Sequence, residues 1–202
     1  MSPILFSSRL LRTSSRWVMS LVLVIAIAAH VPSANIALAQ NSSGAASEYD
    51  LKLARIYSTA RFITWPDDST NSVAPFVIGV VDPDPFKGGL KKLEQRKLKN
   101  RPIRIVMLNT EQDYQACHLL FIPADAKPAV VKEIMKRTAD QPVLVWRDEA
   151  DPKGSTGVAC SFVRQESDLL IEADPVELKR RNLAPDGQLM SLKLVRMVKP
   201  GK

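Results

Sequence analysis

Four short apolar runs alternate along the chain with segments that have helical periodicity. The runs lie at residues 76–81, 103–108, 118–122 and 143–146. They are continuously apolar and rich in β-branched residues, which is typical of strands buried on both faces of a sheet. Strands that alternate with helices in this way form a mostly parallel sheet with helices on both sides. The pattern therefore predicts an α/β fold, a three-layer sandwich around a mostly parallel sheet.

The helices are predicted from apolar residues that recur at intervals of three and four. The first runs from Glu48 to Ile63, with no Gly or Pro before Pro66, as expected for an amphipathic helix. Further helices are expected at 86–94, 128–137, 176–182 and 189–198. The chain therefore alternates between strands and helices from residue 48 to about residue 148.

The pattern changes after Asp148. Residues 158–163 and 169–172 are two short strand-like runs, and the polar residues 165–168 between them favour a hairpin turn. A tight turn of this kind joins strands that are antiparallel neighbours. We therefore expect an antiparallel hairpin at one edge of the sheet.

The first 39 residues have the layout of a cleavable signal peptide. Three arginines precede an apolar stretch at 17–29, and the small-residue sequence Ala-Leu-Ala follows at 37–39. The apolar stretch is shorter than the ~20 residues that span a bilayer. We expect a signal peptide at 1–39 that is cleaved after Ala39; a retained membrane anchor is the alternative.

Cleavage at this point would change both the charge and the compartment of the protein. It removes three arginines and no acidic residue, so the formal charge falls from +7 to +4 over the remaining 163 residues. We expect a flexible leader at 40–47 and a single domain at 48–202, located in an extracytoplasmic compartment, where disulfides can form. Nucleic acid is out of reach there, so we expect no nucleic-acid partner.

The mature chain lacks the motifs of common enzymes. It has one histidine, His118, and no nucleophile elbow, dinucleotide fingerprint or phosphate-binding loop. We expect a protein that is not an enzyme, with no catalytic residues, no cofactor and no metal site. Asp82 and Asp84 follow the first strand and could bind a ligand at the mouth of the sheet, or they could shape a turn. A periplasmic small-molecule binding protein is therefore the alternative function.

The two cysteines, Cys117 and Cys160, have two alternative fates. In an oxidising compartment they could form a disulfide, which would stabilise a loop of this length by roughly 4 kcal/mol. Two separate buried thiols are the alternative, since Cys is among the most buried residue types. His118 adjoins Cys117, but neighbours in a strand point to opposite faces, so we expect a buried or half-buried pair and not a nucleophile.

Several segments resemble the YfiR-like family of periplasmic proteins. Residues 53–66 have a Tyr, an Ala-Arg-Phe and a Trp-Pro at the family's spacing. Further similar segments are 78–86, 117–122, 170–174, 181–183 and 190–194. The resemblance spans residues 49–196, nearly all of the expected mature chain.

The resemblance implies a repressor that acts by binding protein. Such proteins bind the periplasmic domain of a membrane diguanylate cyclase of the YfiN type and hold it inactive, which lowers cyclic di-GMP and biofilm formation. An outer-membrane lipoprotein of the YfiB type sequesters the repressor, and family members are homodimers. The best-known member has two disulfides that respond to redox state. In this chain Cys117 and Cys160 match two of the family's cysteines. The family cysteine that usually pairs with the first of them is replaced here, at about Gly79.

The end of the first helix carries candidate partner-binding residues. Arg61, Phe62 and Trp65 place a cation beside two aromatic side chains, a combination that is enriched at interface hot spots. Alternatively, the two aromatic side chains cap the core while Arg61 makes a structural ion pair.

A basic stretch lies between Lys87 and Arg104. It holds eight basic residues against a single acidic one. Such a run is either a solvated face or a patch that contacts a partner or the anionic surface of the membrane. The partner-binding candidates within it are Lys91, Lys92, Arg96 and Lys97.

Overall fold

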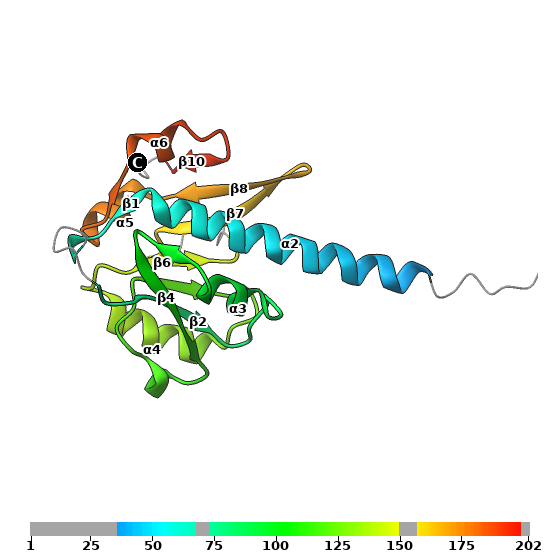
Figure 1. The fold of residues 1–202 in the computed structure, drawn as a ribbon, viewed down its shortest axis with the longest axis horizontal. Helices are drawn as coiled ribbons and strands as arrows, with labels where there is room; N and C mark the ends of the chain where they lie inside the picture. The colour runs from blue at the N-terminus through cyan, green and yellow to red at the C-terminus, as the bar shows by residue number, and fades with distance from the viewer. Residues whose placement is uncertain (1–35, 68–72, 150–156, 199–202) are drawn as a thin grey trace, which may run out of the picture. The chain divides into compact units, whose positions relative to one another are not determined.

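Eight strands form one sheet in the part of the chain that this computed structural model describes, residues 36–67, 73–149 and 157–198 (Figure 1). The order across the sheet is β10-β8-β7-β6-β5-β2-β4-β3. The strands are β2 (Phe76–Val81), β3 (Lys97–Leu98), β4 (Arg101–Leu108), β5 (Leu119–Ile122), β6 (Leu144–Arg147), β7 (Cys160–Gln165), β8 (Asp168–Ala173) and β10 (Val195–Met197). Strands β4, β2, β5, β6 and β7 are mutually parallel. The predicted α/β class and the mostly parallel sheet are confirmed.

Five helices and a second, smaller sheet complete the described part of the fold. The helices are α2 (Ile36–Arg61), α3 (Gly89–Glu94), α4 (Pro128–Thr138), α5 (Pro175–Arg180) and α6 (Gly187–Ser191), with a short 3-10 helix η3 (Glu111–Asp113). The smaller sheet pairs β1 (Ile63–Thr64) with β9 (Ala184–Pro185) in antiparallel register. It ties the segment after α2 to the segment after α5.

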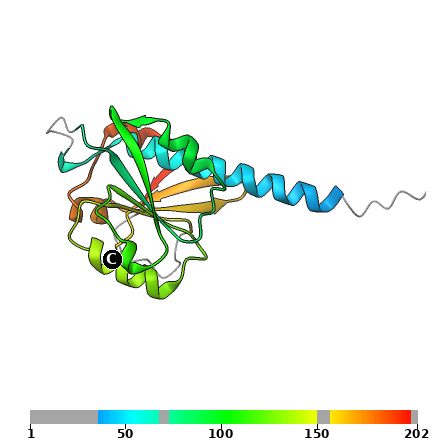
Figure 2. The ribbon, with the colours of Figure 1, turned by 60° about the horizontal axis from the view of Figure 1, so that its bottom comes forward.

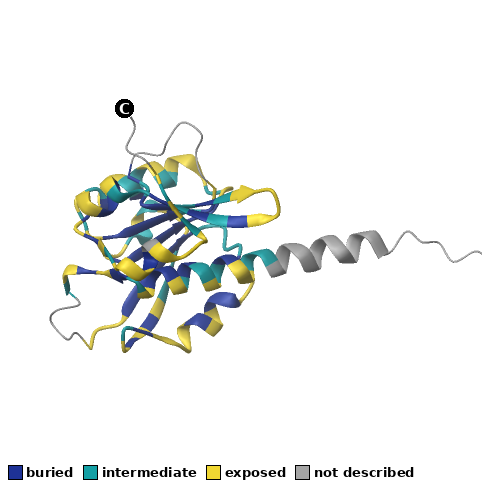
Figure 3. Ribbon diagram, turned by 90° about the horizontal axis from the view of Figure 1, so that it is seen from above, coloured by how far each residue is buried: buried dark blue, intermediate teal, exposed yellow. Residues whose placement is uncertain are grey.

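The large sheet separates two apolar cores, as a three-layer sandwich requires. Figure 2 shows helices on both faces of this sheet. Along β2, the side chains of Phe76, Ile78 and Val80 belong to the core beneath α2 and α3, and Val77 and Val81 belong to the core beneath α4. All six residues of β2 are buried, and the buried positions follow the strands through the middle of the domain (Figure 3). The continuous apolar run at 76–81 thus has the two-sided burial that it predicts.

Helix α2 begins earlier than the sequence analysis expects. Its backbone is helical from Ile36, so residues 40–47 are helical where a flexible leader was expected. The chain divides into two compact units at residues 43 and 44, and the α/β fold lies within the second. The signal-peptide features at 1–35 lie outside the described residues, and cleavage after Ala39 stays a prediction.

Helix α3 begins later than expected, at Gly89 instead of residue 86. The reason is the backbone of Gly88, which has a left-handed φ of 87° that an α-helix does not accept.

The strand predictions are closer to the structure. Each predicted strand begins and ends within two residues of the observed one.

The C-terminal segment corrects two predictions. Residues 189–198 were expected to form one helix, but α6 ends at Ser191 and β10 follows. In β10 Val195 and Met197 pack on the core while Arg196, between them, pairs with Glu172 of β8. This alternation has the period of a strand. Because β10 pairs with β8, the antiparallel β7–β8 hairpin does not form the edge of the sheet.

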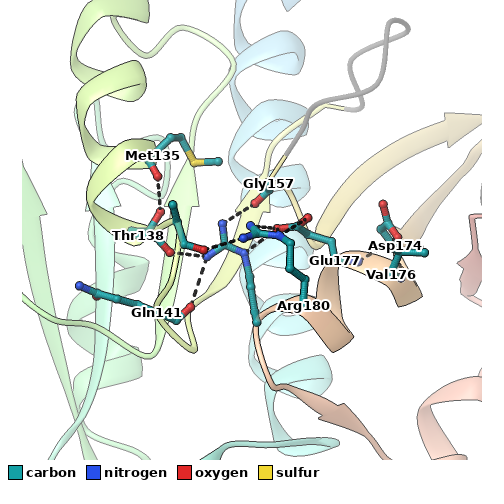
Figure 4. A network of polar contacts seen from close by, with 10 residues as sticks. Met135, Thr138, Gln141, Gly157, Asp174, Val176, Glu177 and Arg180 are labelled. Atoms are coloured by element: carbon teal, nitrogen blue, oxygen red, sulfur yellow. Dashed lines mark hydrogen bonds and ion pairs between the residues drawn. The ribbon is translucent and has the colours of Figure 1, made fainter.

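A buried cation, Arg181, joins the end of α5 to the end of α4. Figure 4 shows the network of polar contacts around Glu177, Thr138 and Gly157. Arg181 is only 2% exposed, and its guanidinium donates hydrogen bonds to the carbonyl oxygens of Thr138 and Gly157, both at 2.8 Å. It also pairs with the carboxylate of Glu177 at 3.0 Å. These contacts satisfy a charge that burial would otherwise make costly.

Candidate partner-binding groove

A groove of about 350 Å³ lies between α2 and α3, which run side by side in Figure 1. Its lining residues on α2 are Asp50, Leu53, Ala54, Tyr57, Ser58 and Arg61. Its lining residues on and just after α3 are Gly89, Lys92, Leu93 and Arg96. The groove therefore brings together three of the predicted partner-binding residues, Arg61, Lys92 and Arg96.

Helical periodicity explains how the α2 side of the groove forms. Each of the positions 50, 53, 54, 57 and 61 lies three or four residues from another of the set, so that they share one face of the helix. The other helix approaches closely because Gly89 has no side chain: a Cβ atom there would lie 3.0 Å from a methyl group of Leu53. The two helices thus meet at the N-terminal end of α3, over buried Leu90 and Leu93.

Tyr57 fixes the other end of the groove. Its hydroxyl group donates a hydrogen bond of 2.9 Å to the carbonyl oxygen of Lys97, the first residue of β3. The guanidinium of Arg96 lies over the Tyr57 ring, 5.7 Å from the centroid, in a cation–π arrangement. Arg96 is therefore held at the groove by an aromatic ring, and it has no carboxylate partner among the described residues.

The basic side chains of the groove have no carboxylate partners in the part of the chain that the structure describes. Arg61, Lys92 and Arg96 are all exposed, and the ion pairs among the described residues involve other side chains. Asp50 is the only acidic residue among those that line the groove. The groove is a concave, cationic surface with an apolar floor of Leu53 and Leu93.

The surrounding basic stretch does not act as one surface. Lys91 and Lys97, also predicted as partner-binding residues, are exposed outside the lining of the groove. Arg101 is only 4% exposed and points inward, where its guanidinium lies 2.9 Å from the carboxylate of Asp67. One of the eight basic residues is therefore structural.

One comparison with known proteins gives a match, and it is to a protein family. Residues 49–193 match the sequence profile of the YfiR/HmsC-like family. The chain belongs to this family. A search of curated proteins gives no match. The YfiR/HmsC-like family suggests a periplasmic, non-catalytic regulator of cyclic di-GMP signalling. None of the helices among the described residues is long and apolar enough to cross a membrane.

In this YfiR/HmsC-like chain the aromatic candidates at the end of α2 pack inward. Trp65 is 2% exposed, and its indole N–H donates to the carbonyl oxygen of His118 at 3.1 Å. Its ring also meets Phe76 edge to face, with centroids 5.0 Å apart. Phe62 is half-buried against the same core. Trp65 is therefore a core residue, and only Arg61 of this trio is an exposed side chain.

The imidazole ring of His118 makes polar contacts with the neighbouring strand β2 and with Asp67. The Val77 amide donates a hydrogen bond of 3.0 Å to Nδ1. Nε2 lies 2.8 Å from a guanidinium nitrogen of Arg101 and 3.1 Å from the carboxylate of Asp67. The ring stacks on Phe76, on the opposite side of the sheet from Cys117. The predicted half-buried pair is confirmed.

The possible disulfide between Cys117 and Cys160 is not formed. Both are free and buried, and they lie in different cores on opposite faces of the sheet, which side chains cannot bridge. Burial raises the pKa of each thiol to about 12. The structure thus has the second alternative, two separate thiols.

Asp84, one of the two ligand candidates after β2, has a structural role. Its carboxylate accepts a hydrogen bond of 2.8 Å from the Phe86 amide, as Asp does in turns. Neither Asp82 nor Asp84 lines the groove between α2 and α3. The geometry at this position supports the turn and gives no support to a ligand mouth.

Sequence reasoning missed several residues of the groove. Asp50, Tyr57, Ser58 and Gly89 line it but were not predicted as site residues. The spacing of Asp50, Tyr57 and Arg61 along the predicted helix places them on one face and could have indicated a shared surface. No local pattern indicates that α3 packs against that face.

Proposed function

We propose that this protein is a periplasmic repressor that binds the periplasmic domain of a YfiN-type membrane diguanylate cyclase and holds it inactive. The match to the YfiR/HmsC-like family over residues 49–193 carries this proposal. The groove between α2 and α3 supports it, because a concave surface with unneutralised cations suits protein recognition. Repression lowers cyclic di-GMP and, with it, biofilm formation.

Gene deletion and complementation test this proposal. In a strain that has such a cyclase, deletion should raise cellular cyclic di-GMP, and expression of the exported protein should restore the original level. Expression without residues 1–39 is the matched control, because a protein that stays in the cytoplasm cannot reach the periplasmic domain. An unchanged cyclic di-GMP level after deletion would contradict repression.

The proposal extends to export and assembly. We propose that residues 1–39 are a signal peptide, so that the mature chain begins at Gln40, and that the mature protein is a homodimer. A YfiB-type outer-membrane lipoprotein would release the cyclase by sequestering the repressor. N-terminal sequencing of the periplasmic protein tests the cleavage position, and light scattering tests the mass. A mature protein that begins at a residue other than Gln40 would contradict the proposed cleavage site. A monomeric mass would contradict the homodimer.

A further inference from the structure

We infer that the groove between α2 and α3 binds an acidic, amphipathic segment of the partner protein, with carboxylates on either side of an apolar side chain. This inference rests on the proposed function and names the surface and the chemistry of the contact. The described residues offer three independent arguments for it, from charge, from shape and from the fixed position of one cation.

The charge argument starts from the three cations of the groove. Arg61, Lys92 and Arg96 are exposed and make no ion pair within residues 36–67, 73–149 and 157–198. The ion pairs among the described residues involve other cations, as Lys52 with Asp148 and Arg181 with Glu177 show. Complementary potentials favour a partner that brings carboxylates to the three free cations.

The shape argument concerns the floor of the groove. Leu53 is half-buried, Leu93 is 5% exposed, and the small residue Ala54 lines the groove with them. A volume of about 350 Å³ is at the lower end of the range for binding pockets. It suits a few side chains of one segment, of which the central one is apolar. A helix laid into a groove presents side chains in this way.

The third argument is that Arg96 is already in place. Its guanidinium lies 5.7 Å from the centroid of the Tyr57 ring, and Tyr57 is itself fixed by its hydrogen bond to Lys97. A cation that is held in position loses less side-chain entropy on binding than a free one. Its guanidinium can also grip a carboxylate with two hydrogen bonds.

A membrane surface would use the basic residues differently. Lipid headgroups present a broad anionic plane, which attracts exposed lysines and arginines whether or not they line a groove. The exposed residues outside the groove, such as Lys91 and Lys97, would then contribute as much as those inside it. The concave shape and the apolar floor favour a protein segment, and the experiment below separates the two.

The experiment measures binding of the exported, purified protein to full-length cyclase in nanodiscs of zwitterionic lipid. The groove variant is Lys92→Glu/Arg96→Glu. The matched control is Lys132→Glu/Arg137→Glu, which makes the same charge change on exposed positions of α4, on the other face of the sheet. Empty nanodiscs with phosphatidylglycerol measure lipid binding alone. Thermal unfolding of each variant confirms that it folds, and Arg96→Lys tests whether the charge suffices.

We expect the groove variant to weaken binding at least about 30-fold and the control variant less than about threefold. The affinity of the original protein should fall between about 50 and 300 mM salt, because ions screen exposed charges. A photoreactive residue at Ser58 should crosslink to a cyclase peptide with at least two acidic residues.

Four results would overturn the inference, and they are distinguishable. If both double variants bind the cyclase equally well, the groove is not the contact, while the proposed function stands. If the photoreactive residue crosslinks to a cyclase peptide without acidic residues, the segment that binds in the groove is not acidic. If empty anionic nanodiscs bind as tightly as those with cyclase, the surface binds lipid. If the original protein does not bind the cyclase at all, the proposed function itself fails, and this inference with it.

Discussion

The ammonium group of Lys52 on α2 lies 2.8 Å from a carboxylate oxygen of Asp148, the residue that follows β6. Both are buried, with 5% and 1% exposure. The second oxygen of Asp148 accepts a hydrogen bond of 2.9 Å from the Tyr49 hydroxyl, and Lys52 also pairs with Glu48 at 3.0 Å. This ion pair fixes the helix that forms one wall of the groove to the carboxyl end of the sheet.

Replacing Lys52 with Met should destabilise the protein by about 3–5 kcal/mol, because the change leaves the buried carboxylate of Asp148 without its cation. Urea-induced unfolding followed by circular dichroism measures this free energy. The double variant Lys52→Met/Asp148→Asn removes both charges, keeps an acceptor for Tyr49, and should recover a large part of the loss. A cost below about 1 kcal/mol for the single variant would show that this pair contributes little, as exposed pairs do.

Glu177 provides a second test of burial, because two arginines share its carboxylate. The side chain of Arg181 is fully buried and that of Arg180 is 42% exposed. Arg181→Met should cost about 3–5 kcal/mol, since it leaves Glu177 and two carbonyl groups without a buried donor. Arg180→Met should cost less than about 1 kcal/mol, as is usual for exposed pairs. Chemical unfolding compares the two, and equal costs would contradict the role assigned to burial.

The same carboxylate predicts a loss of stability in acid. Burial acts to raise the pKa of Glu177, but the hydrogen bond from Arg180 and the charges of both arginines outweigh burial and hold the pKa below its usual value. A carboxyl group with a lowered pKa in the folded state stabilises above its unfolded pKa of about 4.3. This stabilisation is lost as the pH falls through the folded pKa. Glu177→Gln should therefore flatten the fall in unfolding free energy below about pH 4.5.

Glu149→Gln is the control for this pH dependence, because Glu149 is exposed. Unfolding free energies measured from pH 7 down to about pH 3 should follow the original protein in the Glu149 variant and diverge from it in the Glu177 variant. Parallel curves for all three proteins would assign the acid sensitivity to other carboxylates.

The sequence predicts those parts of the fold that depend on local pattern. Residues 76–81 are continuously apolar because both faces of β2 are covered, so the run itself reveals the strand. Residues 189–198 were misassigned because the period-two alternation of β10 extends over only three residues. A segment of that length is decided by pairing with β8, which no local pattern encodes.

The candidate site was predictable only in part, for a similar reason. The basic residues were visible as a run, but nothing within the run distinguishes Lys92, which lines the groove, from Arg101, which is buried. The difference arises from Asp67, which lies 34 residues before Arg101 and pairs with it. Burial of Trp65 likewise depends on Phe76 and His118. Long-range packing therefore decides which candidates reach the surface.

The two cysteines should be unreactive in the folded protein. Burial raises the pKa of both thiols to about 12, and the thiolate is the reactive form. At pH 8 the native protein should react with a thiol reagent at neither cysteine, whereas the protein unfolded in denaturant without reductant should react at both. Mass spectrometry counts the modified thiols. Fewer than two in denaturant would indicate a disulfide and contradict the structure.

Gly79 explains why Cys117 lacks a partner on its own side of the sheet. A Cβ atom at residue 79 would lie 3.4 Å from the sulfur of Cys117, with methyl groups of Leu108 and Leu120 at 3.2 and 3.4 Å. In a disulfide the distance from one Cβ to the far sulfur is roughly 3 Å. A cysteine at position 79 would therefore lie close to bonding geometry, in a crowded part of the core.

Gly79→Cys should form a disulfide with Cys117 in the oxidising periplasm. The bond closes a loop of about 38 residues, which would stabilise the fold by ~4 kcal/mol in the chain-entropy model, less the strain of moving the two leucines. Alkylation in denaturant should find one free thiol, at Cys160, and three after reduction. Gly79→Ala is the control for crowding, because it adds a Cβ atom without a thiol. Gly79→Cys/Cys117→Ser is the control for the disulfide, because it removes the thiol that residue 79 would bond to. If the oxidised Gly79→Cys protein still has three free thiols, residue 79 and Cys117 are not neighbours as the structure places them.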